Sequence, residues 1–302
     1  MSDRAALQLL SVAADGMDIF LLAGGSYRGG MLHGTRLVNQ MRANHRLGIM
    51  ETLILGHAYL AAGLMTSLVK GNDRIRLDIS CDGPVGGISV DSNARGEIRG
   101  YLRNSRIRID TPLDSFDTAP FIGSGTLTVT RTIEMAKRPV SGHVRMEHGT
   151  LAEDLPNYFL VSEQKPTAVS LSIQFDREGV VTGAGALFIQ ALPESHHSVA
   201  ADLDQAVRAL PSLGSMFAEG DTPAHAIKTL LSEFDPEIIG SRTAELSCPC
   251  SRQRFGRYLH SLPTSELEDI LTNGPLPVNV TCHSCNSTYI YGREEIELLA
   301  TR

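Results

Sequence analysis

Four of the five cysteines in this 302-residue chain lie in two close pairs near its C-terminal end. One pair is Cys248 and Cys250, with Pro249 between them, and the other is Cys282 and Cys285. Each spacing brings two sulfurs within reach of one metal ion, and four thiolates suit tetrahedral Zn²⁺. The sequence therefore predicts one zinc ion per chain, bound by these four cysteines.

The same pairs also permit redox chemistry. Neighbouring thiols act as thiol–disulfide switches, and each pair can close a disulfide within itself, which would eject the metal. In small zinc modules the metal contributes on the order of 10 kcal/mol to folding. Oxidation would then unfold the C-terminal module, and a neighbouring segment that docks on it would lose its support. A static zinc site is the competing interpretation.

Other candidate residues have simpler interpretations. Cys81 has no partner cysteine in sequence and is predicted to be a small buried residue. His283 lies inside the CxxC loop and is expected to face solvent, because four sulfurs already complete the site. Four further histidines lack a matching ligand set and are interpreted as surface or capping residues: His143, His148, His196 and His197. No catalytic triad or carboxylate pair stands out, so we predict that the protein is not an enzyme.

The composition is that of a globular protein, with 42% hydrophobic and 20% charged residues. The net charge of -7 disfavours general binding to nucleic acid or to an anionic membrane. No export signal is visible in the first residues, so we expect a cytoplasmic protein with reduced thiols. The segment 47–69 is long and apolar enough to span a membrane. It contains Glu51 and His57, and a buried core helix is the better interpretation.

Residues 1–192 are predicted to form an α+β domain with a mainly antiparallel sheet. Short strands at close spacing favour antiparallel pairing; they are expected at 18–23, 74–80, 88–90, 98–102, 125–131, 168–175 and 180–192. Helices are expected at 31–45 and 47–69. The glycine-rich stretch 24–30 is interpreted as a flexible turn. Gly183 and Gly185 suggest a close backbone approach.

Residues 193–245 contain four prolines and no strand pattern. Two short helices fit between the prolines, and each is too short to be stable alone in water. Each must therefore dock its apolar face elsewhere, and we predict a helical linker whose order depends on its neighbours. The apolar faces include Leu203 and Val207 on the first helix, and Leu230 and Phe234 on the second.

Residues 246–302 are predicted to form a small zinc-binding α/β module. The CxxC pair lies between two strand-like segments, 278–280 and 289–291, which indicates a hairpin with the cysteines at its turn. Short helices are expected at 265–271 and 294–299. Arg252, Arg254 and Arg257 could offset the negative charge of a four-thiolate site.

This cysteine pattern, at this spacing and at the C-terminal end, resembles the redox-regulated heat-shock holdases of the 33 kDa chaperonin family. Several stretches resemble the N-terminal domain of that family: CDGPVGGISVDSNARGEIRGYLRN, GTLTVTR, LAEDLPNYFLVSEQKPTAVSLSI and GAGALFIQALP. The stretch PLPVNVTCHSCNSTYIY resembles its zinc-binding arm.

The resemblance implies a mechanism. Reduced protein would hold zinc through all four cysteines and be inactive. Oxidants would form the disulfides Cys248–Cys250 and Cys282–Cys285, release zinc, and unfold the module and the linker. The exposed apolar surface would hold unfolding client proteins without ATP, and the active form would be a homodimer. We expect clients to bind the linker faces at Leu203, Val207, Leu230 and Phe234 and the sheet beneath them.

The main alternative is a zinc-ribbon nucleic-acid-binding or regulatory protein. Residues 241–302 hold six Arg, no Lys, and seven Asp plus Glu, a net charge of -1. Such a balance is poorly suited to a phosphate backbone, so nucleic acid is an unlikely partner. An enzyme with a structural zinc is a second alternative, and the lack of a recognisable active site disfavours it.

Overall fold

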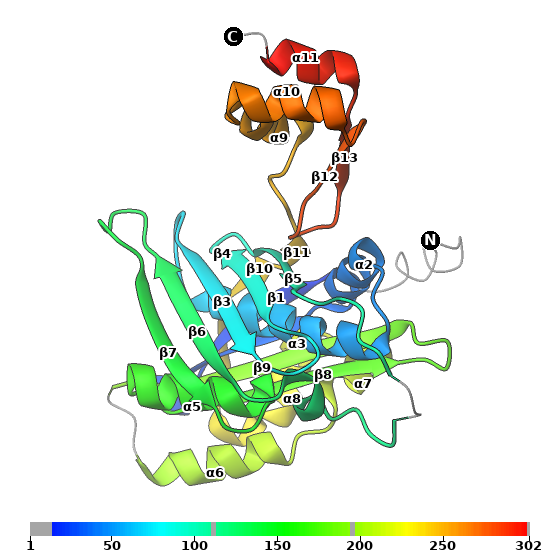
Figure 1. The fold of residues 1–302 in the computed structure, drawn as a ribbon. Coiled ribbons are helices and arrows are strands. Elements are labelled where there is room, and N and C mark those ends of the chain that lie inside the picture. The colour runs from blue at the N-terminus through cyan, green and yellow to red at the C-terminus, as the bar shows by residue number, and fades with distance from the viewer. Residues whose placement is uncertain (1–13, 110–112, 194–196, 301–302) are drawn as a thin grey trace. The chain divides into compact units, whose positions relative to one another are not determined.

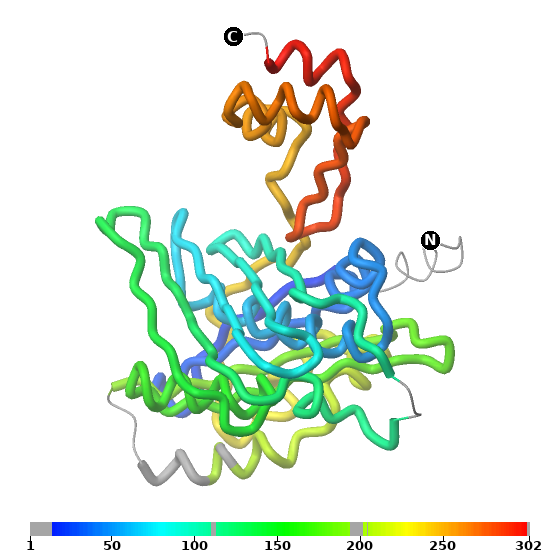
Figure 2. Tube along the Cα trace, viewed as in Figure 1, coloured from blue at the N-terminus to red at the C-terminus, as the bar shows by residue number. Residues whose placement is uncertain are grey.

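The structure is a computed structural model that describes residues 14–109, 113–193 and 197–300. The chain divides into two compact units, Met1–Ser247 and Cys248–Arg302. The first unit holds two sheets with helices between and around them, and the second holds a short hairpin with helices (Figure 1). The path of the chain through both units is traced in Figure 2.

The first sheet has five strands, each antiparallel to its neighbours. Their order is β10 (Glu237–Thr243), β1 (Gly16–Leu22), β2 (Tyr27–His33), β9 (Val181–Ala191) and β8 (Thr167–Phe175). Successive residues of a strand point to opposite faces. On β2, Leu32 joins one hydrophobic core, and its neighbour Met31 joins the other. This sheet therefore separates two cores.

The second sheet has six strands, and only β11 runs parallel to its neighbour, β5. Their order is β11 (Glu245–Leu246), β5 (Glu97–Leu102), β4 (Ile88–Asn93), β3 (Arg74–Cys81), β6 (Gly125–Thr132) and β7 (Val140–Met146). On β3 the alternate residues Ile75, Leu77 and Ile79 are buried, as the sequence pattern predicts. The predicted α+β class with mainly antiparallel sheets is confirmed.

Helix α3 (Ile49–Met65) packs against strands of both sheets, with α2 (Thr35–His45) beside it. It continues into the short helix η2 (Thr66–Leu68). The stretch Ile49–Leu68 has the length and composition of a membrane span, but 89% of its most apolar window is buried inside the protein. A helix that is apolar all round is stable when other elements surround it. The prediction of a buried core helix is confirmed.

Two further helices complete the α+β core, α4 (Ala119–Ile122) and α5 (Leu151–Glu163). Helix α5 packs against β7 and β8. Its buried side chains include Leu155 and Phe159, which join the core around α3. These contacts connect the two sheets, since β7 belongs to one and β8 to the other.

The linker helices are α6 (His197–Arg208), α7 (Leu213–Ala218) and α8 (Pro223–Leu230), followed by η3 (Ser232–Phe234). They pack on the second core of the five-stranded sheet. Leu203 and Val207 are buried there, and Leu230 and Phe234 are half-buried against the same core. All four candidate client-binding side chains thus pack against the sheet in this conformation.

Helix α7 approaches β9 closely at the two glycines. A Cβ atom at Gly183 would lie 1.9 Å from the carbonyl oxygen of Gly214, and one at Gly185 would lie 2.6 Å from the ring of Phe217. Any larger residue would push α7 away from the sheet. The predicted close backbone approach is confirmed, and its partner is a linker helix.

The N-terminal segment differs from the prediction in two ways. The expected helix at 31–45 begins only at Thr35, because residues 31–33 belong to β2. The glycine-rich stretch 24–30 is not one flexible turn. The turn between β1 and β2 consists of η1 (Ala23–Gly25) and Ser26, and Gly29 and Gly30 already belong to β2. A Cβ atom at Gly29 would lie 2.2 Å from the ring of Phe20, so this glycine makes room for an aromatic side chain in the sheet.

The linker is also not helical throughout. Its residues 237–243 form β10, which pairs with β1 and was not predicted. Most β10 residues are exposed, so the strand lacks the apolar alternation that identifies a half-buried strand in sequence. The guanidinium of Arg242 anchors β10 by donating to the carbonyls of Val69 and Ala94, both at 3.0 Å, and to that of Thr66.

The second unit contains α9 (Arg252–His260), α10 (Thr264–Asn273), β12 (Val278–Thr281), β13 (Thr288–Tyr291) and α11 (Arg293–Ala300). The predicted hairpin is confirmed as β12 and β13, which pair antiparallel. The two predicted helices are confirmed as α10 and α11, whereas α9 was not predicted. Among the described residues, the buried centre of this unit's hydrophobic cluster consists of Leu267, Tyr291 and Ile296.

Candidate metal centre

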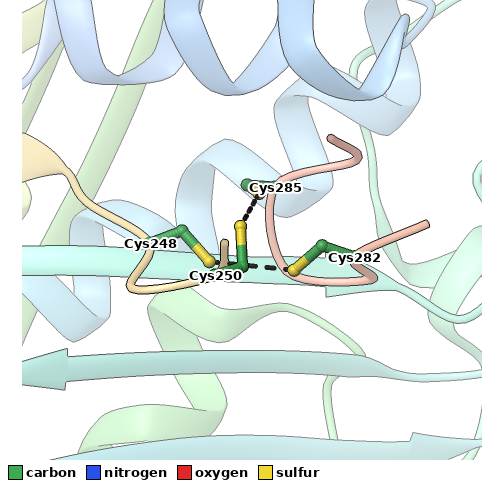
Figure 3. Close-up of side chains that lie close together, drawn as sticks. All are labelled: Cys248, Cys250, Cys282 and Cys285. Atoms are coloured by element: carbon green, nitrogen blue, oxygen red, sulfur yellow. Dashed lines mark hydrogen bonds between the residues drawn. The ribbon is translucent and has the colours of Figure 1, made fainter. Parts of the chain in front are cut away.

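The four cysteines of the second unit converge on one point (Figure 3). Their sulfur atoms all lie within 4.8 Å of one another. The Sγ atoms of Cys248 and Cys282 are 3.7 Å apart, and those of Cys250 and Cys285 are 3.3 Å apart. A tetrahedral zinc site with Zn–S bonds of about 2.3 Å places its sulfurs about 3.8 Å apart. The four thiols therefore fit a single four-coordinate metal ion.

Cys282 and Cys285 occupy the turn of the β12–β13 hairpin. The turn is closed by the N–H of Cys282, which donates to the carbonyl of Ser287 at 2.9 Å, and by the N–H of Asn286, which donates to the carbonyl of Cys282 at 2.7 Å. Asn286 has a φ of 58°, in the left-handed region that Asn tolerates. The N–H groups of Cys285 and Ser284 favour the thiolate form of Cys282. Burial raises the pKa of Cys282, and the backbone of this turn offsets part of that effect.

Cys248 and Cys250 lie on the segment that leads into α9. The hydroxyl of Ser251 caps this helix by accepting a hydrogen bond from the N–H of Arg254 at 3.2 Å. From the hairpin, the hydroxyl oxygen of Tyr289 lies 3.1 Å from the sulfur of Cys250. Sequence reasoning missed this tyrosine, and the signal available was an aromatic residue four positions after Cys285.

The arginines after the CxC pair do not all have the predicted role. The guanidinium of Arg252 forms hydrogen bonds of 2.6 and 2.7 Å with the carboxylate of Glu295 and lies over the ring of Tyr291. Arg254 donates to the hydroxyl of Tyr258 at 3.3 Å. Arg252 is thus paired with a carboxylate of α11, which largely neutralises its positive charge.

The thiols differ in acidity. Burial raises the pKa of Cys250 to about 12 and also raises the pKa of Cys282. Burial opposes ionisation of Cys285 as well, but hydrogen bonds with the side chain and backbone of Ser287 and with the neighbouring thiols together outweigh it and lower the pKa of Cys285 to about 7. A metal that binds all four thiolates must displace protons, so the affinity for the metal will decrease as the pH is lowered.

The remaining candidate residues stay outside the metal centre. Cys81 is half-buried against the main core of the first unit, and burial raises its pKa. His283 is exposed, as expected, and so are His143 and His148. His196 and the side chain of His197 lie outside the described residues. Within the described ranges, the four-cysteine set is the one cluster of three or more potential metal ligands.

The fold and the site together define a class: an α+β protein of two mainly antiparallel sheets, with a cluster of four cysteines that could bind a metal ion in a small C-terminal unit. Comparison with known proteins gives the family. The model of the family described as "Hsp33 protein" matches residues 15–292. The chain therefore belongs to the Hsp33 family of chaperones, as the resemblance predicted, and membership implies that it binds unfolded proteins.

Individual relatives agree. The 33 kDa chaperonin of Desulforamulus reducens is 33% identical over 280 residues, which are 92% of this chain and 94% of the relative. That of Aquifex aeolicus is 32% identical over 273 residues, which are 88% of this chain and 83% of the relative. The crystal structure of the 33 kDa chaperonin from Thermotoga maritima superposes with a TM-score of 0.84 at 27% identity, covering 95% of this chain and 98% of that one.

Proposed function

We propose that this chain is a redox-regulated, ATP-independent holdase. Zn²⁺ bound by four reduced cysteines keeps it inactive, and oxidation activates it to hold unfolding proteins. The observation that carries the proposal is the placement of all four thiols in a unit with a very small core. Below about 70 residues, a hydrophobic core rarely supplies more than about 3–5 kcal/mol, whereas a structural zinc contributes on the order of 10 kcal/mol. Loss of the metal would then unfold Cys248–Arg302.

When bound, Zn²⁺ would join the CxC segment to the hairpin turn through four thiolates. The same thiolates are the groups that an oxidant attacks. In each pair, two thiolates give two electrons to one hydrogen peroxide molecule and form one S–S bond. Two protons from solvent complete the two water molecules that result. We propose the pairs Cys248–Cys250 and Cys282–Cys285, and a sulfur in either disulfide no longer serves as a thiolate ligand.

The linker is the proposed route from the metal centre to the client-binding surface. The N–H of Ser247 donates to the carbonyl of Ile98 at 3.1 Å, one residue before Cys248. Unfolding of the C-terminal unit frees the chain next to this hydrogen bond. We propose that β10 and the linker helices then detach. Leu203, Val207, Leu230 and Phe234 would be exposed, together with the sheet face beneath them, and clients would bind there.

Two further properties follow from the proposal. We propose that the protein works in the cytoplasm, where reductants keep the thiols available to the metal until oxidative stress occurs. The exposed apolar surface of the oxidised form would also pair two chains, because contiguous apolar patches of this kind favour association. The active species would then be a homodimer.

The test combines three measurements on one preparation. Zinc-loaded protein is treated with hydrogen peroxide at mild heat, zinc release is followed with a chromogenic chelator, and disulfides are mapped by mass spectrometry. Aggregation of a thermally unfolding client is then measured with oxidised protein and with protein kept in dithiothreitol. We expect one zinc released per chain, disulfides within each pair, and protection by the oxidised form alone.

Other outcomes point elsewhere. Equal protection by both forms, or by neither, would refute redox control. Disulfides Cys248–Cys282 and Cys250–Cys285 would refute the proposed pairing, and they are the alternative that the short sulfur–sulfur distances allow. Salt-sensitive binding to DNA or RNA, without client protection, would instead favour a zinc-ribbon nucleic-acid-binding protein.

A further inference from the structure

Tyr289 contacts the metal centre without being a ligand of it. Its hydroxyl oxygen lies 3.1 Å from the sulfur of Cys250, and its strand, β13, begins three residues after Cys285. The side chain therefore reaches from the hairpin to the other cysteine pair. The hairpin turn that carries Cys282 and Cys285 is closed by its own backbone hydrogen bonds, and Tyr289 adds a side-chain contact from this hairpin to the CxC segment.

Packing fixes the direction of this hydroxyl. The ring of Tyr289 lies 5.3 Å from the ring of Phe255 on α9, at an interplanar angle of 41°. Both rings pack against the small core of the second unit. On the opposite strand, Val280 pairs with Tyr289 in the β12–β13 ladder. The ring of Tyr289 is thus packed between its own strand and helix α9, and this packing limits the movement of the hydroxyl.

A metal-bound cysteine is a thiolate and has no proton to donate, so the hydroxyl of Tyr289 must be the donor. We infer that Tyr289 is a positioning residue of the metal centre: it donates a hydrogen bond to the Cys250 thiolate, keeps the CxC segment on the hairpin, and slows attack on this sulfur by peroxide. A hydrogen bond to a thiolate draws electron density from the sulfur, which lowers its nucleophilicity and stabilises it as a ligand. This inference rests on the proposed metal-binding and redox function.

Two other tyrosines provide matched comparisons. Tyr291 lies on the same face of β13, and its hydroxyl donates to the backbone carbonyl of Arg252 at 2.5 Å. Tyr258 on α9 accepts a hydrogen bond from Arg254. Each of the three hydroxyls therefore has a different described partner: a sulfur, a carbonyl and a guanidinium. Replacement of each tyrosine by Phe removes one hydroxyl and keeps the ring.

The experiment uses the full-length chain as wild type, Tyr289→Phe, Tyr291→Phe and Tyr258→Phe. Zinc release is timed with a chromogenic chelator, with and without hydrogen peroxide. Loss of an outer partner of a metal ligand typically changes metal affinity about 10–100-fold, so we expect Tyr289→Phe to release zinc roughly tenfold faster under both conditions. Tyr258→Phe should stay within about twofold of wild type.

A spectroscopic measurement separates this role from general destabilisation. The proteins are loaded with Co²⁺, and the sulfur-to-cobalt charge-transfer band is recorded. Removal of a hydrogen bond makes the sulfur more electron-rich, so the band should shift to longer wavelength in Tyr289→Phe. Tyr291→Phe should lower the melting temperature, because it leaves a carbonyl without its buried partner, but its band should match that of wild type.

The outcomes distinguish this inference from the proposed function. An unshifted band together with wild-type release rates in Tyr289→Phe would overturn the inference, whatever the chaperone assay shows. A shifted band in Tyr289→Phe would support the inference even if oxidised and reduced wild-type protein protected clients equally, and equal protection would refute redox control. A wild-type protein that binds neither Co²⁺ nor Zn²⁺ would overturn both.

Discussion

Cys250 and Cys285 lie 3.3 Å apart at the sulfur atoms, yet their environments drive their ionisation in opposite directions. Burial raises the pKa of Cys250, whereas the side chain and backbone of Ser287 help to lower the pKa of Cys285. The hairpin turn supplies such donors through Ser287. At the scale of single residues, the four-cysteine cluster therefore contains neighbouring thiols whose pKa values are shifted in opposite directions.

Removal of one ligand should separate the metal centre from the isolated thiol. We expect Cys285→Ser to lower zinc affinity by more than the roughly 10–100-fold typical of an outer-shell change. Cys81→Ser should keep one zinc per chain, since Cys81 lies in the other unit and outside the cluster. Zinc content after dialysis against a chelator series gives the answer, and equal zinc content in the two variants would contradict a four-cysteine site.

At the scale of elements, the linker is attached to the two sheets of the first unit by several separate contacts. Helix α7 sits on the glycines of β9, α8 packs on β1 and β2, and β10 pairs with β1. Arg242 connects β10 to backbone carbonyls at the end of α3 and in the β4–β5 turn. A guanidinium suits the end of a helix, where carbonyls lack partners and the helix dipole is negative.

The contact between α7 and the glycines of β9 can be altered by a substitution far from the cysteines in the sequence. Gly183→Ala places a methyl group against the carbonyl of Gly214, and overpacking of this kind costs about 1–3 kcal/mol. We expect α7 to detach more readily, with faster hydrogen exchange in residues 213–218 and partial client protection by reduced protein. Gly240→Ala on β10 is the control, because a Cβ atom there meets nothing within 4 Å. Equal hydrogen-exchange rates in the two variants would argue against a role of Gly183 in holding α7 on the sheet.

At the scale of the whole molecule, the two units have different sources of stability. The first has two extensive hydrophobic cores that share one sheet, whereas the second has a three-residue buried centre and a cluster of four cysteines that could bind a metal ion. The first unit also encloses titratable groups. His33 is buried against Phe217 of the linker helix α7, with ring centroids 4.8 Å apart, and bonds to the hydroxyl of Thr35 at 2.8 Å. His57 lies on the core helix α3.

Acid should therefore destabilise the first unit. Burial lowers the pKa of His33 and that of His57 to about 4. The stability that these neutral histidines contribute is present above pH 6.5 and is lost as the pH falls toward 4, because the unfolded chain binds the extra protons. Asp15 opposes them: burial raises its pKa to about 6, so the folded protein gains stability as the pH falls below that value. Two groups act against one, and we expect a net loss.

Urea unfolding followed by circular dichroism, in excess chelator at pH 7.5, 6.5, 5.5 and 4.5, measures this loss. The chelator removes the metal at every pH, so only the protein's own groups contribute. His57→Gln should reduce the loss between pH 6.5 and 4.5, and His143→Gln, at an exposed position, should leave it unchanged. A midpoint that rises steadily toward pH 4.5 in wild type would contradict the prediction.

The sequence by itself predicted the four-cysteine cluster, the core helix and most strands, because these features depend on local spacing. A CxC and a CxxC each place two sulfurs together within one turn, and alternation along β3 or uniform apolarity along α3 is visible in a short window. The family followed from the same local motifs.

The tertiary structure alone decided the features that depend on residues far apart in the chain. Strand β10 exists because its backbone pairs with β1 and Arg242 reaches the carbonyl of Thr66 at the end of α3, although its own side chains are mostly exposed. Gly29 makes room for Phe20, and Gly183 makes room for α7. Tyr289 reaches Cys250 only because the hairpin brings β13 beside the CxC segment. Periodicity records which face of an element is apolar, whereas the partner of that face is set by the folded chain.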